Sequence, residues 1–306
     1  MKILVTGGTN GMGKGVAKIL AGMDNQSHEI ILLCRSKELG EATIEEFEGI
    51  SGNRKITMVL CDLTRLRDVR SAIEEIQSEH QFLDGIFINA GLGYAAKRVE
   101  TEDGMDSHFQ VNYLSQFMLT LNLLNLLESS ENGGRIIFNV TEGGKIFWDD
   151  LQMKNEWGYE KGIGQAMVAK RMFYNKLHDL YRNLDSPKVS FVGFQIPKTV
   201  WTNQVNIIPA HMKMMASVMK FFGGFITIER CGRIMSPLFT ESKEESLKKS
   251  GKFLTWKKNE FIEIKEDEMV LKKELQDRLW ETSLELCKDQ KTTEIAEELM
   301  TRSRSV

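Results

Sequence analysis

After its first methionine the chain reads Lys2-Ile3-Leu4-Val5-Thr6-Gly7-Gly8-Thr9-Asn10-Gly11-Met12-Gly13, and apolar residues then recur at helical spacing through residue 23. This order predicts a strand, a glycine turn and a helix. Residues without a Cβ allow the sharp bend and let the backbone approach a pyrophosphate at the helix N-terminus. The stretch therefore predicts a dinucleotide site, with a merely tight turn as the alternative. We expect it to be lined by Gly7, Thr9, Asn10, Gly11, Met12 and Gly13.

Short apolar runs and helical patterns continue to alternate along the chain. Strands are expected at residues 29–34, 55–62, 85–89, 135–140 and 188–195, and helices at 37–50, 67–80, 105–129 and 164–183. Parallel strands need crossovers, and the crossovers are most often helices. No linker rich in Pro, Gly or Ser divides the chain. We predict an α/β fold, a Rossmann-type doubly wound parallel sheet in a single domain over residues 1–288.

The pattern changes after Pro197. Methionine and phenylalanine become dense, at Met212, Met214, Met215, Met219, Phe221, Phe222 and Phe225. Methionine in such density suits an adaptable apolar wall, so residues 197–230 fit a helical C-terminal lid over a lipophilic substrate. Ordinary core or a dimer contact fits the same pattern. A last helix is expected at 267–287, followed by a polar, mobile tail at 289–306.

Composition excludes several classes of function. The 306 residues are 42% hydrophobic and 27% charged, and a net charge of −3 offers no basic field for nucleic acid. The four cysteines are scattered, which indicates a reduced, cytoplasmic protein without a metal site. The longest apolar stretch, residues 205–226, is interrupted by His211, Lys213 and Lys220. We therefore expect a soluble protein without a transmembrane anchor.

The end of the second strand favours one nicotinamide dinucleotide. A carboxylate at this place accepts from the ribose 2′-hydroxyl, whereas an arginine pairs with a 2′-phosphate. Here the strand ends in Cys34-Arg35-Ser36-Lys37. A planar guanidinium suits phosphate, and Ser36 and Lys37 add donors to it. The sequence predicts NADP(H) as cofactor, and a solvated loop arginine is the alternative.

Further motifs follow in an ordered series. Residues 6–13, Cys61-Asp62-Leu63, Asn89-Ala90-Gly91 and Val111-Asn112-Tyr113 together resemble the motifs of the short-chain dehydrogenase/reductase family. Residues 101–104, 109–120, 150–152, 250–253 and 279–281 resemble its retinol-dehydrogenase and protochlorophyllide-reductase branch. Relatives commonly form dimers or tetramers, so the resemblance implies a homodimer or homotetramer. Some retinoid-metabolising relatives carry an N-terminal membrane anchor, which we do not expect here because the first strand begins at Met1.

The resemblance also implies roles for single residues. Asp62, beside Leu63, would contact the adenine, Asn89, Ala90 and Gly91 would line the cofactor, and Asn112 would support an active-site water and the catalytic lysine. Pro197 and Thr202 match residues at the nicotinamide end, although Lys198 replaces the usual glycine. Simple structural roles, as turn formers, a tight loop or caps, are the alternatives.

The catalytic positions depart from the family pattern. In relatives a serine and a tyrosine hold the carbonyl while a lysine lowers the pKa of the tyrosine. Here Glu142 stands at the serine position and Ala166 at the tyrosine position, while Lys170 is kept. Loss of a general acid removes roughly 3 to 5 kcal/mol of transition-state stabilisation. Ordinary ketone reduction should be severely impaired.

Candidates to replace the tyrosine are few. Glu142 would be an acid with a raised pKa if apolar walls enclose it, a substrate-binding anion if Lys170 lies close, or a loop residue facing water. Tyr159 and Lys161 precede the catalytic helix and would be substitutes if they swung inward. We expect Lys170, Asn112 and Glu142 to carry the chemistry.

The sequence leaves the reaction open between several classes. The first is an NADP(H)-dependent oxidoreductase acting on an apolar carbonyl, imine or activated C=C bond, because hydride transfer belongs to the cofactor. The second is a non-redox cyclase or isomerase with Glu142 as acid and base. The third is a dinucleotide-binding pseudoenzyme, and the fourth is a variant engineered from tyrosine to Ala166.

Overall fold

A central sheet of eight strands organises the molecule. The computed structural model describes residues 1–23, 28–201, 209–221 and 223–304. The sheet has the order β10-β9-β6-β5-β4-β1-β2-β3, and only the β9–β10 pair is antiparallel. Its strands are β1 (Lys2–Thr6), β2 (Glu29–Cys34), β3 (Ile56–Leu60), β4 (Gly85–Ile88), β5 (Gly134–Asn139), β6 (Val189–Gln195), β9 (Phe253–Lys257) and β10 (Glu260–Glu263). This confirms the doubly wound parallel sheet, to which the sequence analysis had not assigned β9 and β10.

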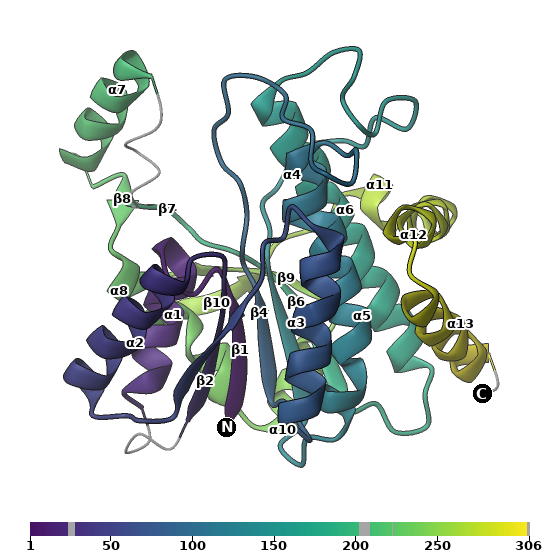
Figure 1. The fold of residues 1–306 in the computed structure, drawn as a ribbon, viewed down its shortest axis with the longest axis horizontal. Coiled ribbons are helices and arrows are strands. Elements are labelled where there is room, and N and C mark those ends of the chain that lie inside the picture. The colour runs from purple at the N-terminus through teal and green to yellow at the C-terminus, as the bar shows by residue number, and fades with distance from the viewer. Residues whose placement is uncertain (24–27, 202–208, 222, 305–306) are drawn as a thin grey trace.

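Helices cover both faces of the sheet (Figure 1). One layer holds α1 (Gly11–Ala21), α2 (Lys37–Ser51) and α8 (Ile228–Met235), and the other holds α3 (Leu66–Glu79), α5 (Ser115–Glu128) and α6 (Tyr159–Arg182). Each buried strand contributes side chains to two apolar clusters, one on each face of the sheet, because successive side chains point to opposite faces. Ile3 and Val5 join the cluster under α1, and Leu4 joins the larger cluster under α5 and α6.

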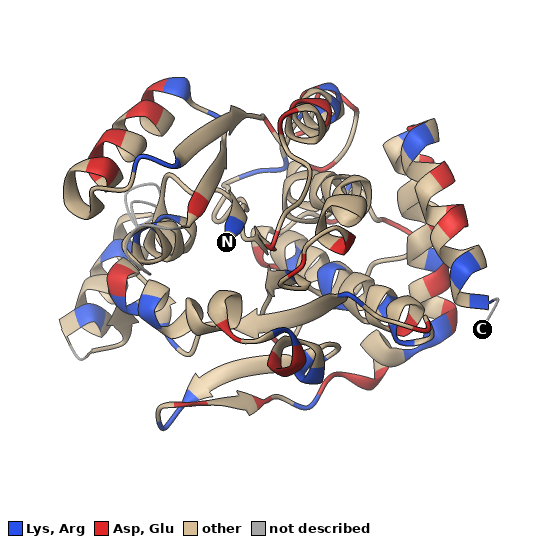
Figure 2. Ribbon diagram, turned by 90° about the horizontal axis from the view of Figure 1, so that it is seen from below, with Lys and Arg blue, Asp and Glu red and all other residues tan. Residues whose placement is uncertain are grey.

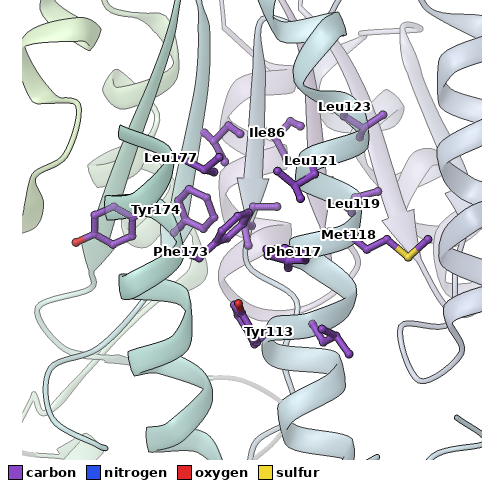
Figure 3. Packing of buried hydrophobic residues seen from close by; sticks show 14 of the residues in the cluster. Ile86, Tyr113, Phe117, Met118, Leu119, Leu121, Leu123, Phe173, Tyr174 and Leu177 are labelled. Atoms are coloured by element: carbon purple, nitrogen blue, oxygen red, sulfur yellow. The ribbon is translucent and has the colours of Figure 1, made fainter. Parts of the chain in front are cut away.

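Aromatic residues fill the larger cluster. The rings of Tyr113, Phe117 and Phe173 converge between α6 and the helical run that contains α5, as Figure 3 shows. The Phe117 and Phe173 ring centroids lie 4.7 Å apart, and Trp280 packs edge-on against Phe117 at 5.5 Å. The core therefore fixes α6, and with it Ala166 and Lys170, against the sheet.

The strand order creates a crevice at the carboxyl edge of the sheet. From β1 the chain moves outward to β2 and β3, then returns to place β4 on the other side of β1. Loops on either side of this switch point diverge, which is where doubly wound folds bind their ligands. The glycine turn after β1 and the loop after β4 both open into this crevice.

The helix expected at residues 105–129 contains an irregular segment. It runs as α4 (Ser107–Phe109), a π-helical segment η2 (Gln110–Leu114) and then α5. A π-helical segment inserts one extra residue per turn and is frequent at functional sites. It includes Asn112, one of the expected active-site residues.

The C-terminal part differs from the expected mobile tail. After α11 (Glu268–Leu271) and α12 (Lys273–Cys287), residues 290–304 form the helix α13 (Gln290–Arg304). Its Thr292, Ala296 and Leu299 are buried. The tail prediction was wrong because these three positions form a short stripe that packs on α5, while most other residues of the segment are polar.

The methionine-rich segment is not core. The helix α7 (Ala210–Phe221) stands away from the body, next to a small ribbon of β7 (Thr199–Val200) and β8 (Phe225–Ile226) (Figure 1). Met214 is 70% exposed and Phe221 86% exposed. The core interpretation was therefore wrong. The short helices α9 (Pro237–Thr240) and α10 (Lys243–Lys249) complete the described elements.

Charges of both signs are interspersed over the molecule (Figure 2). Within the described ranges no helix is long and apolar enough to cross a bilayer. The same residues contain no group of three His, Cys, Asp or Glu side chains placed to hold a metal ion, and all four cysteines are free and buried.

Candidate active site

The glycine turn has the geometry that its composition predicts. Gly7 and Gly11 adopt φ of +68° and +54°, a region that side chains disfavour. A Cβ on Gly13 would lie 2.4 Å from the Gly7 carbonyl oxygen, so only glycine lets α1 pack this closely on the turn. The Asn10 side chain accepts from the Gly11 amide at 2.8 Å and caps α1. The N-terminus of α1 therefore opens toward the crevice, as a pyrophosphate site requires.

Thr6 joins the glycine turn to the loop after β4. Its hydroxyl oxygen accepts from the amides of Asn89 and Ala90, each at 2.9 Å, and donates to the Phe87 carbonyl at 3.1 Å. The Asn89 side chain returns a bond to the Thr6 carbonyl at 3.1 Å. The backbones on both sides of the crevice are thereby held in one fixed arrangement.

Asn112 holds the next stretch of this loop. Its Oδ1 accepts from the Leu92 amide at 2.6 Å, and its Nδ2 donates to the Leu92 carbonyl at 3.1 Å. A Cβ on Gly91 would lie 3.2 Å from the same Oδ1, so the loop lies close against the amide. Asn112 therefore positions the loop directly, in addition to any contact with water or lysine that the resemblance implies.

His108 is a site residue that the sequence analysis missed. It lies four residues before Asn112 on the same helical run, and its Nε2 is 2.8 Å from the Gly93 carbonyl oxygen. The imidazole is 1% exposed, and its Nδ1 has no hydrogen-bond partner within the described residues. The i, i+4 spacing of two polar side chains in a buried helix was the available signal. His108 and Asn112 clamp consecutive residues of one loop.

Lys170 lies in the interior and reaches the end of β5. Its ammonium nitrogen donates to the Asn139 carbonyl at 3.0 Å, and the Asn139 side chain donates to Asn89 Oδ1 at 3.3 Å. The residue is 2% exposed, and no carboxylate within the described residues pairs with it. Burial lowers the pKa of Lys170 to about 7 because the charged form loses its hydration. A hydrogen-bonded chain thus connects this amine through Asn139 and Asn89 to Thr6.

Ala166 and Glu142 lie in opposite environments. Ala166 is fully buried in the larger apolar cluster, one helical turn before Lys170. Glu142 is exposed, and both its amide and its carboxylate bind the Gln195 side chain, at 2.6 and 3.0 Å. Two expectations for Glu142 were therefore wrong: it is neither an acid enclosed by apolar walls nor a partner of Lys170. The reason is that β5 and β6 end side by side, which places Glu142 next to Gln195. It has the environment of a loop residue facing water.

The proposed substitutes for tyrosine point elsewhere. The Tyr159 hydroxyl donates to Glu160 at 3.0 Å, and its ring packs on Tyr94 with centroids 4.9 Å apart. Lys161 pairs with Glu156 at the surface. Because α6 begins at Tyr159, this residue lies two helical turns before Ala166, which excludes the inward-swung arrangement in this conformation.

Of the residues expected at the adenosine end, Arg35 is available for a ligand, whereas the others have partners within the protein. Arg35 is exposed, and its guanidinium has no ion pair within the described residues. Ser36 caps α2 by accepting from the Leu39 amide at 3.2 Å, and Lys37 pairs with Glu41 at 3.7 Å. Asp62 Oδ1 accepts from the amide and hydroxyl of Thr64, at 3.0 and 2.8 Å, so the carboxylate forms a turn.

The remaining expected residues are divided between two regions. Leu63 is buried at 6% exposure, where its carbonyl accepts from the Ser115 hydroxyl at 2.7 Å. Pro197 lies beside Lys198, whose ammonium donates to the Gly223 carbonyl at 2.7 Å. Thr202 lies outside the described residues. The structure therefore brings together the glycine turn, residues 89–91, Asn112 and Lys170, and leaves Glu142 at the surface.

Comparison with known proteins agrees with this geometry. A family model described as short chain dehydrogenase matches residues 1–149. Retinol dehydrogenase 14 of Homo sapiens is 28% identical over 216 residues, covering 66% of this chain and 62% of the relative. The matched residues 1–149 belong to the short-chain dehydrogenase/reductase family. Within this family the chain is also similar to polyprenol dehydrogenase of Danio rerio, at 32% identity over 172 residues, 54% of this chain and 52% of that protein.

Solved structures share the short-chain dehydrogenase/reductase fold. An uncharacterized protein from Mycobacterium paratuberculosis superposes with a TM-score of 0.66 at 17% identity, covering 94% of this chain and 93% of its own. An NADPH-bound short chain oxidoreductase from Pseudomonas aeruginosa PAO1, described as containing an atypical catalytic center, gives 0.61 at 16% identity, with 83% and 94% covered. At such identities the likeness concerns the fold. The curated matches above span little more than half the length of those relatives.

Proposed function

We propose that this protein is an NADP(H)-dependent oxidoreductase with an atypical active site, transferring a hydride to or from an apolar small molecule. The cofactor, when bound, supplies or accepts the hydride. The glycine turn fits its pyrophosphate, and Arg35, which forms no ion pair with any described residue, fits a 2′-phosphate. The substrate group is a carbonyl, an imine or an activated C=C bond. The curated relatives are named for polyprenol and retinol, which supports an apolar substrate.

The observation that carries the proposal is the Lys170 amine. It is buried, its pKa is about 7, and it is fixed on the Asn139 carbonyl at 3.0 Å. An amine with this pKa exists in both forms near neutral pH and can donate or accept a proton there. Because Ala166 supplies no hydroxyl, we assign to Lys170 the proton transfer that a tyrosine performs in relatives. Asn112 and His108 keep the facing loop in place.

A dinucleotide-binding protein without catalysis is the second candidate. Ala166 is fully enclosed and Glu142 faces water, so neither replaces the missing tyrosine. The exposed position of Glu142 also argues against a cyclase or isomerase that uses it as acid and base. Tight NADPH binding without turnover of any apolar carbonyl, imine or enone would favour this second candidate.

Cofactor binding tests the first half of the proposal. We expect calorimetry to show tighter binding of NADPH than of NADH. Arg35→Gln should weaken NADPH binding by about ten- to hundredfold, since one charged hydrogen-bonding contact is lost, and leave NADH unchanged. Arg54→Gln is the matched control, because Arg54 is an exposed arginine that pairs with Glu48. Equal affinities for the two dinucleotides in the unaltered protein would refute the NADP(H) assignment.

Hydride transfer tests the second half. Single-turnover NADPH oxidation should be observed by stopped-flow with a panel of apolar aldehydes, imines and enones. Lys170→Met should lower the rate constant by about 10²- to 10⁴-fold, the usual contribution of a positioned acid. Glu142→Gln should have little effect, because the side chain is exposed. Loss of activity in Glu142→Gln with full activity in Lys170→Met would reverse the assignment.

A further inference from the structure

A cavity lies apart from the catalytic residues, at the end of the sheet that carries β9. Its volume is about 470 Å³, within the range of small-molecule sites. It is bounded by the residues after β6, by β8, by α8 and by the turn between β9 and β10. Lys170, Asn112 and Ala166 do not line it. Arg35 and the glycine turn are not part of its wall either, and Pro197 is the one described residue of the proposed dinucleotide site that lines it.

The interior of this cavity is apolar. Phe225 and Ile226 contribute from β8, Ile234 from α8 and Trp256 from β9. Trp256 is held by edge-on packing against Phe261, with ring centroids 4.9 Å apart. Such a lining favours a hydrocarbon chain or a ring over a polar metabolite, because burying apolar surface is the main source of affinity in such a pocket.

The rim of the same cavity is cationic. Lys198, Arg230, Lys257 and Lys258 all line it, and no carboxylate is among the described lining residues. Arg230, Lys257 and Lys258 form no ion pair within the part of the chain that the structure describes. The whole chain carries 40 basic and 43 acidic residues, so four cations without an acid are a local excess. An unneutralised cluster at the mouth of an apolar pocket favours an anionic head group.

One of these cationic residues, Lys258, has a strained backbone conformation. Lys258 and Asn259 form the turn between β9 and β10, with φ of +53° and +64°. Tight hairpins of this kind favour glycine or asparagine, and a lysine in the left-handed region carries a conformational cost. Strained residues recur where the side chain serves a ligand. Lys258 lies at the rim in a conformation that glycine would adopt more easily.

We propose that this cavity binds an amphipathic anion, with its apolar body against Ile226, Ile234 and Trp256. Its single carboxylate or phosphate would lie at Arg230 and Lys258. A carboxylate head corresponds to a fatty acid and a phosphate head to a lipid phosphate. The wall shares Pro197 with the residues expected at the nicotinamide end of the dinucleotide but does not include Lys170, and we expect the anion to bind without NADPH.

Calorimetric titration of the full chain without dinucleotide tests the proposal. The probes share one chain length and differ in the head: dodecanoate, dodecyl phosphate, dodecanol and dodecyltrimethylammonium, each below its micellar concentration. Dodecanoate or dodecyl phosphate should bind with a stoichiometry of one, and the tighter of the two identifies the natural head group. Dodecanol should bind at least about tenfold more weakly, because it lacks the charge. Equal binding of dodecanol, or no binding of either anion, would overturn the proposal.

Variants locate the site. Arg230→Gln with Lys258→Gln should weaken dodecanoate binding by about ten- to hundredfold. The control with the same charge change, Arg54→Gln with Lys248→Gln, replaces exposed residues elsewhere and should bind normally. Lys258→Gly should raise the melting temperature and yet weaken binding, an outcome that misfolding cannot produce. Asn259→Gly should raise the melting temperature and keep the affinity. Unchanged affinity in both rim variants would place any bound anion elsewhere.

Discussion

The buried amine of Lys170 should make stability depend on pH. Burial lowers its pKa from 10.5 to about 7, so between these values the unfolded chain holds the extra proton. The unfolding free energy contributed by Lys170 therefore rises with pH in this window, by about 1.4 kcal/mol per unit. Lys170→Met removes the dependence. In urea unfolding, its advantage over the unaltered protein should shrink from pH 7 to pH 9, and a gap that stays constant would contradict the burial of a titrating amine.

The same residue should set the pH profile of the proposed reaction. In the direction that reduces substrate, Lys170 must carry a proton, and a pKa of about 7 means that the protonated fraction falls as pH rises above 7. We expect single-turnover NADPH oxidation to decrease with a midpoint near pH 7 and to be unaltered in Glu142→Gln. A profile that is flat from pH 6 to pH 9 would show that Lys170 does not donate the proton.

At the scale of single residues, the place of the candidate site was predictable from the sequence, whereas the surroundings of each side chain were less so. Gly7, Asn89 and Asn112 lie around the crevice because motifs that follow successive parallel strands meet at one edge of the sheet. The environment of Glu142 could not be read from its position. It depends on Gln195, which is more than fifty residues away in the chain and becomes its neighbour only when β5 and β6 pair.

The contact between α1 and α8 depends on two glycines. A Cβ on Gly15 would lie 2.0 Å from the Ile228 carbonyl oxygen, and a Cβ on Gly232 would lie 2.1 Å from the Gly15 carbonyl oxygen. Both neighbours are backbone, so the helices would have to separate. Gly15→Ala should cost about 1 to 3 kcal/mol of unfolding free energy by urea titration, despite the better helix propensity of alanine.

Gly49 provides the matched control for that prediction. It lies inside α2, and a Cβ there would have no atom within 4 Å. Gly49→Ala should therefore stabilise the protein by about 0.5 to 1 kcal/mol through helix propensity alone. Equal effects of the two substitutions would mean that α1 and α8 are not in close contact.

Elements were predictable where one periodicity dominates. The run at residues 29–34 became β2 with unchanged bounds, because a strand buried on both faces is a continuous apolar run. The start of α6 was placed five residues late, since Gly158, Gly162 and Gly164 indicate a loop. Gly162 lies inside the helix instead, and a Cβ there would meet His108 at an ordinary contact distance of 3.4 Å, so neither packing nor backbone conformation demands a glycine or a loop at this position. The π-helical segment could not be predicted, because a shift in backbone hydrogen bonds leaves no clear mark on hydrophobic spacing.

Across the whole molecule, the C-terminal helices close the outer side of the α5–α6 layer. The Asn122 amide in α5 donates to the Thr292 hydroxyl at 2.7 Å, and Arg70 in α3 donates to Asp289 at 2.8 Å. Arg302 pairs with Glu128 at 3.3 Å. These contacts join residues 170 or more apart in sequence, so no local pattern announces them. From its sequence the segment resembles a polar tail, because the residues that hold it in place lie in α3 and α5, far away in the chain.

Docking of α13 can be tested through its buried stripe. Ala296 is fully buried, so Ala296→Asp would place an unpaired carboxylate in an apolar contact, and the helix should detach to hydrate it. Hydrogen exchange followed by mass spectrometry should show lost protection over residues 290–304. Glu298→Asp, on the exposed face, should change nothing. If protection is also lost in α5, the end of the chain stabilises the central core as a whole, because Asn122 and Thr292 are then parts of one cooperative unit. Rapid exchange of α13 in the unaltered protein would contradict the docked arrangement.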